Sequence, residues 1–136
     1  MSTAPIEKKI AKLLDYVKTL EGLQSDCLER MKNDKVYRGS VLYYLYMMAD
    51  TCIALAQMVI RYKGLPKPQS YAETIDILGE HGVLPGEFAY DFARIAGFRN
   101  FLAHDYENVD FEEICKILIE RLGQVREYAD FLEAAL

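Results

Sequence analysis

The sequence predicts an all-α protein, a four- to five-helix up-and-down bundle. Apolar residues recur at steps of three and four along most of the chain, which is the period of an amphipathic helix. No stretch alternates with the two-residue period of a strand, and no Asn-Gly or Asp-Gly hairpin turn occurs. The chain has 136 residues, of which 51% are hydrophobic, with only 8 Gly and 4 Pro. This composition suits one folded domain over residues 1–136 and excludes a disordered or low-complexity chain.

The first helix is expected near the N-terminus, with one apolar stripe and a lysine-rich face exposed to solvent. The stripe consists of Ile6, Ile10, Leu13, Leu14, Val17, Leu20 and Leu23. A short helical piece follows around 26–32. The second helix is long, covering about 35–63, and carries apolar residues on two stripes, so neighbours must cover it on two sides. Gly64, Pro66 and Pro68 end it.

Ser70 and Glu73 have the spacing of a capping box, in which each side chain bonds a free backbone N–H at a helix start. They open a short third helix that ends near Gly82. Pro85 suits the first turn of a fourth helix, about 85–103.

A fifth helix begins after Asp110, with Glu113 repeating the capping pattern. Its inner face consists of Phe111, Ile114, Leu118, Leu122, Val125 and Leu132. The chain contains no internal repeat, so the bundle is built once.

The middle of the second helix must be tested as a membrane span. Residues 41–60 are apolar at 17 of 20 positions, all but Asp50, Thr51 and Gln57, which is about the length that crosses a bilayer. An acidic residue at the centre of such a span costs about 2.5–3.5 kcal/mol of insertion free energy. A helix that is apolar nearly all round is more often a bundle core or an oligomer interface. We therefore expect no membrane span, and a homodimer buried through this helix and the region near the fourth.

The three cysteines, Cys27, Cys52 and Cys115, are an odd number at wide spacings, and the two histidines, His81 and His104, cannot build a zinc cluster. We expect no disulfide scaffold, no metal site, no cofactor, and a reducing, cytoplasmic compartment. The charged N-terminus lacks the apolar core of a signal peptide. The net charge of −5 argues against a nucleic-acid coat or a membrane-surface binder, but allows contact with RNA at a small local site.

Arg99 falls between the apolar positions Phe92 and Ile95 when the fourth helix is drawn as a wheel. A guanidinium is always charged and needs a partner in such a place. One interpretation is a structural ion pair with a core carboxylate such as Asp50. The other is an anion site, because the arginine fork matches two phosphate oxygens. His104 has a structural interpretation too, since a helix C-terminus favours a cation.

The segment Arg99–Tyr106 reads Arg, four residues, His, one residue, Tyr. This pattern resembles the motif of the HEPN superfamily, specifically its HepT-like toxin branch. The resemblance covers nearly the whole chain and includes Pro68–Glu73, Gly82–Pro85, Ala96–Asn100 and Leu102–Tyr106. It implies a homodimeric helical bundle that is a metal-independent endoribonuclease, the toxin of a type VII-like toxin–antitoxin pair. It also implies a partner, an MNT-type nucleotidyltransferase antitoxin.

The resemblance implies that Arg99 and His104 are the catalytic pair and that the antitoxin adds AMP to Tyr106. The chemistry agrees with these roles. The resemblance implies RNA, not DNA, as the substrate, and RNA supplies its own nucleophile in the 2′-OH, so cleavage needs no metal-bound water. His104 can move the proton, and Arg99 can stabilise the charge that develops on the phosphate. Asn100, four residues before His104, could orient the imidazole or bind phosphate.

Arg99 and His104 stand five residues apart, which is about 7.5 Å of rise and roughly 140° of rotation on a helix. Either the helix frays before His104, or the site combines residues from both subunits of a dimer. If the chain is extended after the helix, His104 and Tyr106 point to the same side, and AMP on Tyr106 would then add bulk and negative charge beside the phosphate site. The tyrosines of the long helix are expected to be buried: Tyr37, Tyr44 and Tyr62.

A second hypothesis belongs to another class of function. The chain could be the non-catalytic helical, nucleotide- or protein-binding subunit of a two-component nucleotidyltransferase, with Arg99 and His104 holding a ligand. The acidic net charge favours this hypothesis, whereas the intact Arg, His and Tyr favour the nuclease. Cleavage of RNA by the purified protein separates the two.

Overall fold

The computed structural model describes residues 2–136, and this part of the chain forms eight α-helices, one 3-10 turn and no strand. The all-α prediction is confirmed. The helices are α1 (Ala4–Glu21), α2 (Cys27–Asn33), α3 (Lys35–Lys63), α4 (Tyr71–Glu80), α5 (Gly86–Phe92), α6 (Arg94–Asp105), α7 (Phe111–Glu120) and α8 (Leu122–Ala134), with the 3-10 turn η1 (Tyr106–Asn108) between α6 and α7.

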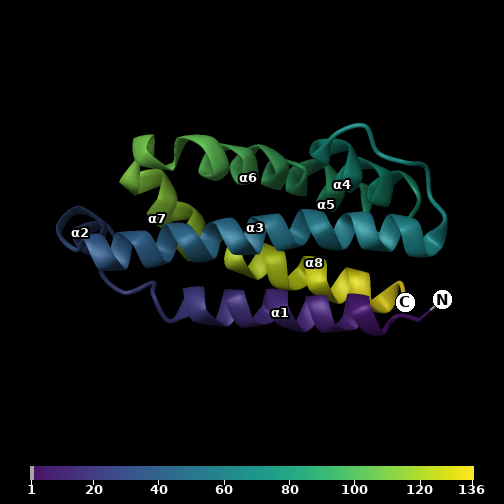
Figure 1. Cartoon of the computed structure of the whole chain (residues 1–136), viewed down its shortest axis with the longest axis horizontal. Coiled ribbons are helices and arrows are strands. Elements are labelled where there is room, and N and C mark those ends of the chain that lie inside the picture. The colour runs from purple at the N-terminus through teal and green to yellow at the C-terminus, as the bar shows by residue number, and fades with distance from the viewer. Residues whose placement is uncertain (1) are drawn as a thin grey trace.

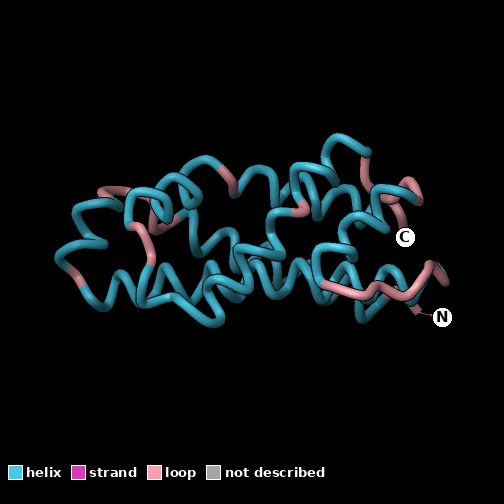
Figure 2. Tube along the Cα trace, turned by 90° about the horizontal axis from the view of Figure 1, so that it is seen from above, coloured by secondary structure: helices cyan, strands magenta, loops and turns pink. Residues whose placement is uncertain are grey.

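The bundle is elongated and is organised around α3, which runs along most of its length (Figure 1). The helix α1 lies along one side of α3, and α6 lies along the other with α4 and α5 beside it. The start of α1 and the end of α8 lie at the same end of the molecule in both views (Figure 2). The opposite end carries α2, η1 and the start of α7.

The long helix α3 has the predicted bounds of 35–63 and is covered on two sides, by α1 and by α6 with α4. Gly64 ends it in the left-handed conformation, with φ of 65°. Among the described residues, α3 alone is long and apolar enough to cross a membrane. However, 56% of its most apolar window is buried inside the protein, and the core helix of a bundle meets the same criteria.

The predicted caps are present at the starts of α4 and α7. Ser70 Oγ accepts a bond of 3.2 Å from the backbone N–H of Glu73. The Glu73 carboxylate in turn accepts one of 3.2 Å from the N–H of Gln69, the residue before the cap. Asp110 Oδ1 accepts bonds from the first turn of α7, including one of 3.4 Å from Glu113. These short-range bonds fix where both helices begin.

The predicted fourth and fifth helices are each broken in two, at Ala93 and at Arg121. No proline marks either break. Instead the Asp91 carboxylate, at the end of α5, accepts bonds from Arg94 at 2.6 Å, from Arg121 at 3.3 Å and from Gln124. The bond from Gln124 outweighs burial and, with the two arginines, lowers the pKa of Asp91. The Asp91 carboxylate therefore links the α5–α6 junction to the α7–α8 junction.

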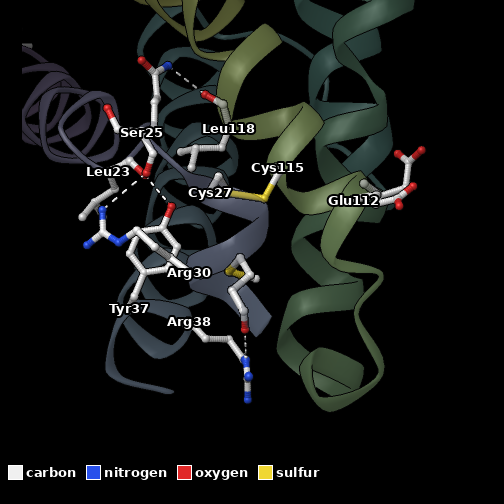
Figure 3. The surroundings of a disulfide bond; sticks show 12 residues. Leu23, Ser25, Cys27, Arg30, Tyr37, Arg38, Glu112, Cys115 and Leu118 are labelled. Atoms are coloured by element: carbon white, nitrogen blue, oxygen red, sulfur yellow. Dashed lines mark hydrogen bonds between the residues drawn. A yellow bond between two sulfur atoms is a disulfide. The ribbon is translucent and has the colours of Figure 1, made fainter. Parts of the chain in front are cut away.

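The expectation that the cysteines form no disulfide was wrong. Cys27 on α2 and Cys115 on α7 are bonded, with their Cα atoms 5.8 Å apart although 88 residues separate them in sequence (Figure 3). Wide spacing does not prevent pairing where the bundle sets two helices side by side. The cysteine pattern therefore gives no support to a reducing compartment. Cys52 is a free thiol, and its complete burial raises its pKa.

Further contacts hold this end of the bundle together. Gln24 Nε2 donates a bond of 3.0 Å to the carbonyl of Leu118 on α7. Arg38 at the start of α3 donates a bond of 2.7 Å from Nε to the carbonyl of Met31 on α2. The Arg38 guanidinium also lies 4.9 Å from the centre of the Phe111 ring, the first residue of α7. The disulfide is thus part of a brace between α2, α3 and α7.

Breaking the disulfide should destabilise the protein. Cross-links of this kind contribute about 2–4 kcal/mol, mainly by restricting the unfolded chain. We expect the Cys27→Ser/Cys115→Ser variant to unfold in urea with a free energy lower by that amount. The unmodified protein in excess dithiol should match it. Equal stability of the oxidised and reduced protein would contradict the bond.

Candidate functional site

The centre of the site is Arg99, which projects from α6 onto the middle of α3. Its Nε donates a bond of 3.0 Å to Asp50 Oδ1. Its two other nitrogens donate to Asn100 Oδ1 at 3.1 Å and to the Tyr46 hydroxyl at 3.3 Å. The Arg99 side chain is only 16% exposed, while that of Asp50 is 42% exposed. The structural interpretation, an ion pair with Asp50, is therefore confirmed, and the site stands at the surface.

Two tyrosine rings also contact the Arg99 guanidinium. Its central carbon lies 4.9 Å from the centre of the Tyr71 ring and 5.5 Å from that of Tyr46. These distances are those of cation–π contacts. Sequence reasoning missed both tyrosines, because nothing in a chain with ten tyrosines singles out the two that α3 and α4 bring to α6.

Arg99 stays positively charged, and some of its N–H groups have no partner within the described part of the chain. Burial opposes its charge and lowers its pKa, but the hydrogen bond that Arg99 donates to Asp50 and the nearby Tyr46 and Tyr71 outweigh burial and raise the pKa above its ordinary value. A guanidinium has five N–H groups. Asp50, Asn100 and Tyr46 take one each. Two N–H groups therefore remain for an anion, which suits the two oxygens of a phosphate.

His104 does not join this cluster. The helix α6 continues to Asp105, which excludes the first of the two alternatives, a helix that frays before His104. On an intact helix the side chains of Arg99 and His104 diverge by roughly 140°. Within residues 2–136 no hydrogen bond links the imidazole to Arg99 or Asn100, and His104 is exposed in the last turn of α6. Asn100 orients Arg99 instead of the imidazole.

Tyr106 follows on the 3-10 turn η1, not on an extended segment. The extended chain that would turn His104 and Tyr106 to the same side is therefore absent. The expected accessibility is confirmed, because Tyr106 is 53% exposed. Of the tyrosines expected to be buried, Tyr37 is, whereas Tyr44 and Tyr62 are half-buried.

A cavity of about 330 Å³ lies away from this cluster, between α6 and the α7–α8 pair. Its walls are mostly apolar, and the Asp91 carboxylate at its rim is already bound by Arg94, Arg121 and Gln124. Neither Arg99 nor His104 lines it. Within the described residues, no three His, Cys, Asp or Glu side chains gather as metal ligands. The chemistry-bearing groups are therefore those at Arg99 and at the end of α6.

The Arg99–Asp50 pair, whose carboxylate is 42% exposed, should contribute little to stability. Pairs of this exposure contribute about 0.2–1 kcal/mol in double-mutant cycles. We expect a coupling in that range from urea unfolding of Arg99→Ala, Asp50→Ala and the double variant. The pair Arg126–Glu21, with an N–O distance of 2.6 Å and side chains that are 42% and 37% exposed, is the control for a surface pair. A coupling above about 3 kcal/mol would identify Arg99–Asp50 as a buried structural pair.

Comparisons with known proteins agree with this helical arrangement. Residues 6–133 match the family described as Ribonuclease HepT-like. The mRNA nuclease HepT of Shewanella oneidensis is 22% identical over 129 residues, covering 95% of this chain and 96% of that protein. A putative RNase of Archaeoglobus fulgidus is 24% identical over 127 residues, covering 88% of this chain and 95% of that protein.

Among solved structures, a tri-AMPylated HEPN toxin of Shewanella oneidensis in complex with an MNT antitoxin has the same fold. Its TM-score is 0.86 at 22% identity, over 98% of this chain and 99% of that chain. The family match covers nearly all of the sequence, and the chain belongs to the Ribonuclease HepT-like family.

Proposed function

We propose that this chain is the toxin of a type VII-like toxin–antitoxin pair and acts in the cytoplasm as a metal-independent endoribonuclease on RNA. The observation that carries the proposal is the state of Arg99, a cation oriented by three partners with two N–H groups left for a phosphate. Membership of the Ribonuclease HepT-like family and the relative named mRNA nuclease support the same activity.

The reaction follows from RNA's own chemistry. The 2′-oxygen attacks the adjacent phosphorus and forms a new P–O bond, while the bond from phosphorus to the 5′-oxygen breaks. A base takes the 2′ proton, and an acid gives one to the departing 5′-oxygen. His104 fills these proton-transfer roles, and Arg99 stabilises the negative charge on the phosphate oxygens during attack. The products are a 2′,3′-cyclic phosphate and a 5′-hydroxyl.

A homodimer completes the site, since Arg99 and His104 diverge on one helix. Two exposed apolar side chains flank these residues. Tyr43, which is 55% exposed, lies two turns before Asp50 on the same face of α3. Phe101, which is 37% exposed, lies three residues before His104 on α6. A second copy seated on this apolar surface would bring its His104 toward Arg99 and bury both side chains.

We propose that the nuclease is inhibited by modification of Tyr106. A phenol that is 53% exposed is open to a partner enzyme, and the MNT-type antitoxin would transfer AMP to its oxygen. The solved relative is AMPylated and bound to an MNT antitoxin, which supports this assignment. The added AMP would bring bulk and negative charge beside His104 at the end of α6 and so hinder the approach of RNA phosphate.

The purified protein should cleave RNA, and undiminished cleavage in excess chelator is expected because His and Arg carry the chemistry. Arg99→Ala and His104→Ala should each lower the rate by at least about 100-fold. Circular dichroism and mass in solution should stay unchanged. Cleavage that needs added magnesium, or two folded variants that still cut, would overturn the mechanism. Absence of cleavage by the unaltered protein would favour the non-catalytic nucleotidyltransferase subunit.

Mixing the two inactive variants tests the shared site. A dimer of one Arg99→Ala copy and one His104→Ala copy still contains one intact pair if Arg99 and His104 come from different subunits. We therefore expect the mixture to regain part of the activity after subunit exchange, while each variant alone stays inactive. A monomeric mass at micromolar concentration, or no recovery despite proven exchange, would contradict the shared site.

Tyr106→Phe should retain ribonuclease activity and lose sensitivity to the antitoxin's enzymatic activity. The change removes only the oxygen that would carry AMP. Incubation of the unaltered protein with the cognate nucleotidyltransferase and ATP, followed by peptide mass spectrometry, should show AMP on the peptide containing Tyr106. Tyr90→Phe is the control, because Tyr90 is 87% exposed but lies on α5. AMP on another tyrosine would refute the assignment.

A further inference from the structure

We propose that Tyr71 is a substrate-binding residue whose ring stacks on the nucleobase next to the phosphate held by Arg99. The proposal rests on the proposed action on RNA and adds to it a residue that contacts a base. It would make Tyr71 a determinant of RNA affinity, distinct from the groups that move protons or stabilise charge.

The capping box at Ser70 explains how Tyr71 comes to its place. Ser70 is extended, with φ of −152° and ψ of 168°, and its hydroxyl accepts the Glu73 N–H. Tyr71 is the first residue of α4, and its carbonyl accepts a bond from the Thr74 hydroxyl, which is fully buried. These two bonds fix the backbone at the start of α4, and from there the Tyr71 ring reaches the Arg99 guanidinium on α6.

The two tyrosines at Arg99 differ in what they do. Tyr46 uses its hydroxyl, which accepts a bond from Arg99, and it is half-buried. Within residues 2–136, the Tyr71 hydroxyl has no hydrogen-bond partner in the protein, and the side chain contributes its ring to the site. Tyr71 is 39% exposed, even though its ring centre is only 4.9 Å from the guanidinium. A tyrosine that served only to hold Arg99 could be covered, whereas this one offers ring surface to a ligand.

The chemistry of RNA makes that surface useful. Every internal phosphate is flanked by two nucleosides, so a phosphate on Arg99 brings a base within reach of an aromatic ring next to the guanidinium. Proteins that bind single-stranded RNA commonly stack bases on exposed aromatic side chains, and removing one such ring weakens binding by about 5- to 150-fold.

The charge of the chain makes such a contact more important. Most RNA-binding proteins gain affinity from a basic surface. This chain has a net charge of −5, and its site offers one guanidinium that already faces Asp50. General attraction to phosphates is therefore weak, and stacking provides affinity that charge does not.

The test compares the binding of two probes, a short fluorescent 2′-O-methyl RNA of mixed sequence and an abasic strand with the same backbone. Neither probe can be cleaved, because its 2′-oxygens are blocked. The abasic strand also has no base that could stack on a ring. Tyr71→Leu should weaken binding of the base-containing probe by about 5- to 150-fold and leave binding of the abasic strand unchanged. Tyr71→Phe, which keeps the ring, should bind like the unaltered protein. Tyr90→Leu, which removes an exposed ring from α5, should also have no effect.

Cleavage kinetics separate this role from the positioning of Arg99. If Tyr71 stacks on a base, Tyr71→Leu raises KM for RNA and changes kcat little. A fall in kcat with unchanged KM and unchanged probe binding would overturn the proposal and make Tyr71 a positioning residue for Arg99. Equal weakening for both probes would also overturn it. If the unaltered protein prefers the base-containing probe but cuts no RNA, the nuclease proposal fails while the stacking contact stands.

Discussion

The contact between Arg99 and Asp50 joins the packing of α6 on α3 to the chemistry of the candidate site. Arg99 is the more buried partner, with a side chain that is 16% exposed, and a charge in such a place is costly unless an opposite charge offsets it. Asp50, on α3, provides that opposite charge at 3.0 Å and links α6 to the middle of α3. The same contact favours the charged form of Arg99 and orients its guanidinium. One pair thus serves packing and chemistry together, and for this reason the structural and functional interpretations of Arg99 do not exclude each other.

Two further sets of contacts hold the chain, one on each side of the Arg99–Asp50 contact. At the start of α6, the Asp91 carboxylate ties α5 and α6 to α8 through Arg94, Arg121 and Gln124. Beyond its end, the bond from Cys27 to Cys115 ties α7 to α2. The chain from 94 to 115 is therefore anchored at both ends and at Arg99. Between the anchors lie the exposed residues from His104 to Asn108, where a partner can reach the chain without disturbing the core.

The elements predicted well are those fixed by short-range bonds. The bounds of α3, and the caps at Ser70 and Asp110, depend on residues within four positions of each other, which a sequence displays directly. The breaks at Ala93 and Arg121 depend on one carboxylate that collects donors from two helices, and no local signal marks them.

The same distinction holds for the site. The spacing of Arg99, His104 and Tyr106 is visible in the sequence, and so is the conflict between that spacing and an intact helix. Tyr46 and Tyr71 come to Arg99 only through packing of α3 and α4 against α6. The disulfide joins positions 88 residues apart for the same reason.

An intact α6 has a consequence for how such a protein could be controlled. If the reaction needs both Arg99 and His104 at one phosphate, a single chain cannot perform it, since the two side chains leave the helix in directions about 140° apart. The proposed ribonuclease activity then depends on the association of two copies of the chain. The exposed turn that carries Tyr106 comes directly after the end of α6, where His104 lies. On this proposal, a group attached there would meet both the second copy and the RNA. One modification can then block both substrate entry and the meeting of the two halves of the site, without any change in the fold of the bundle.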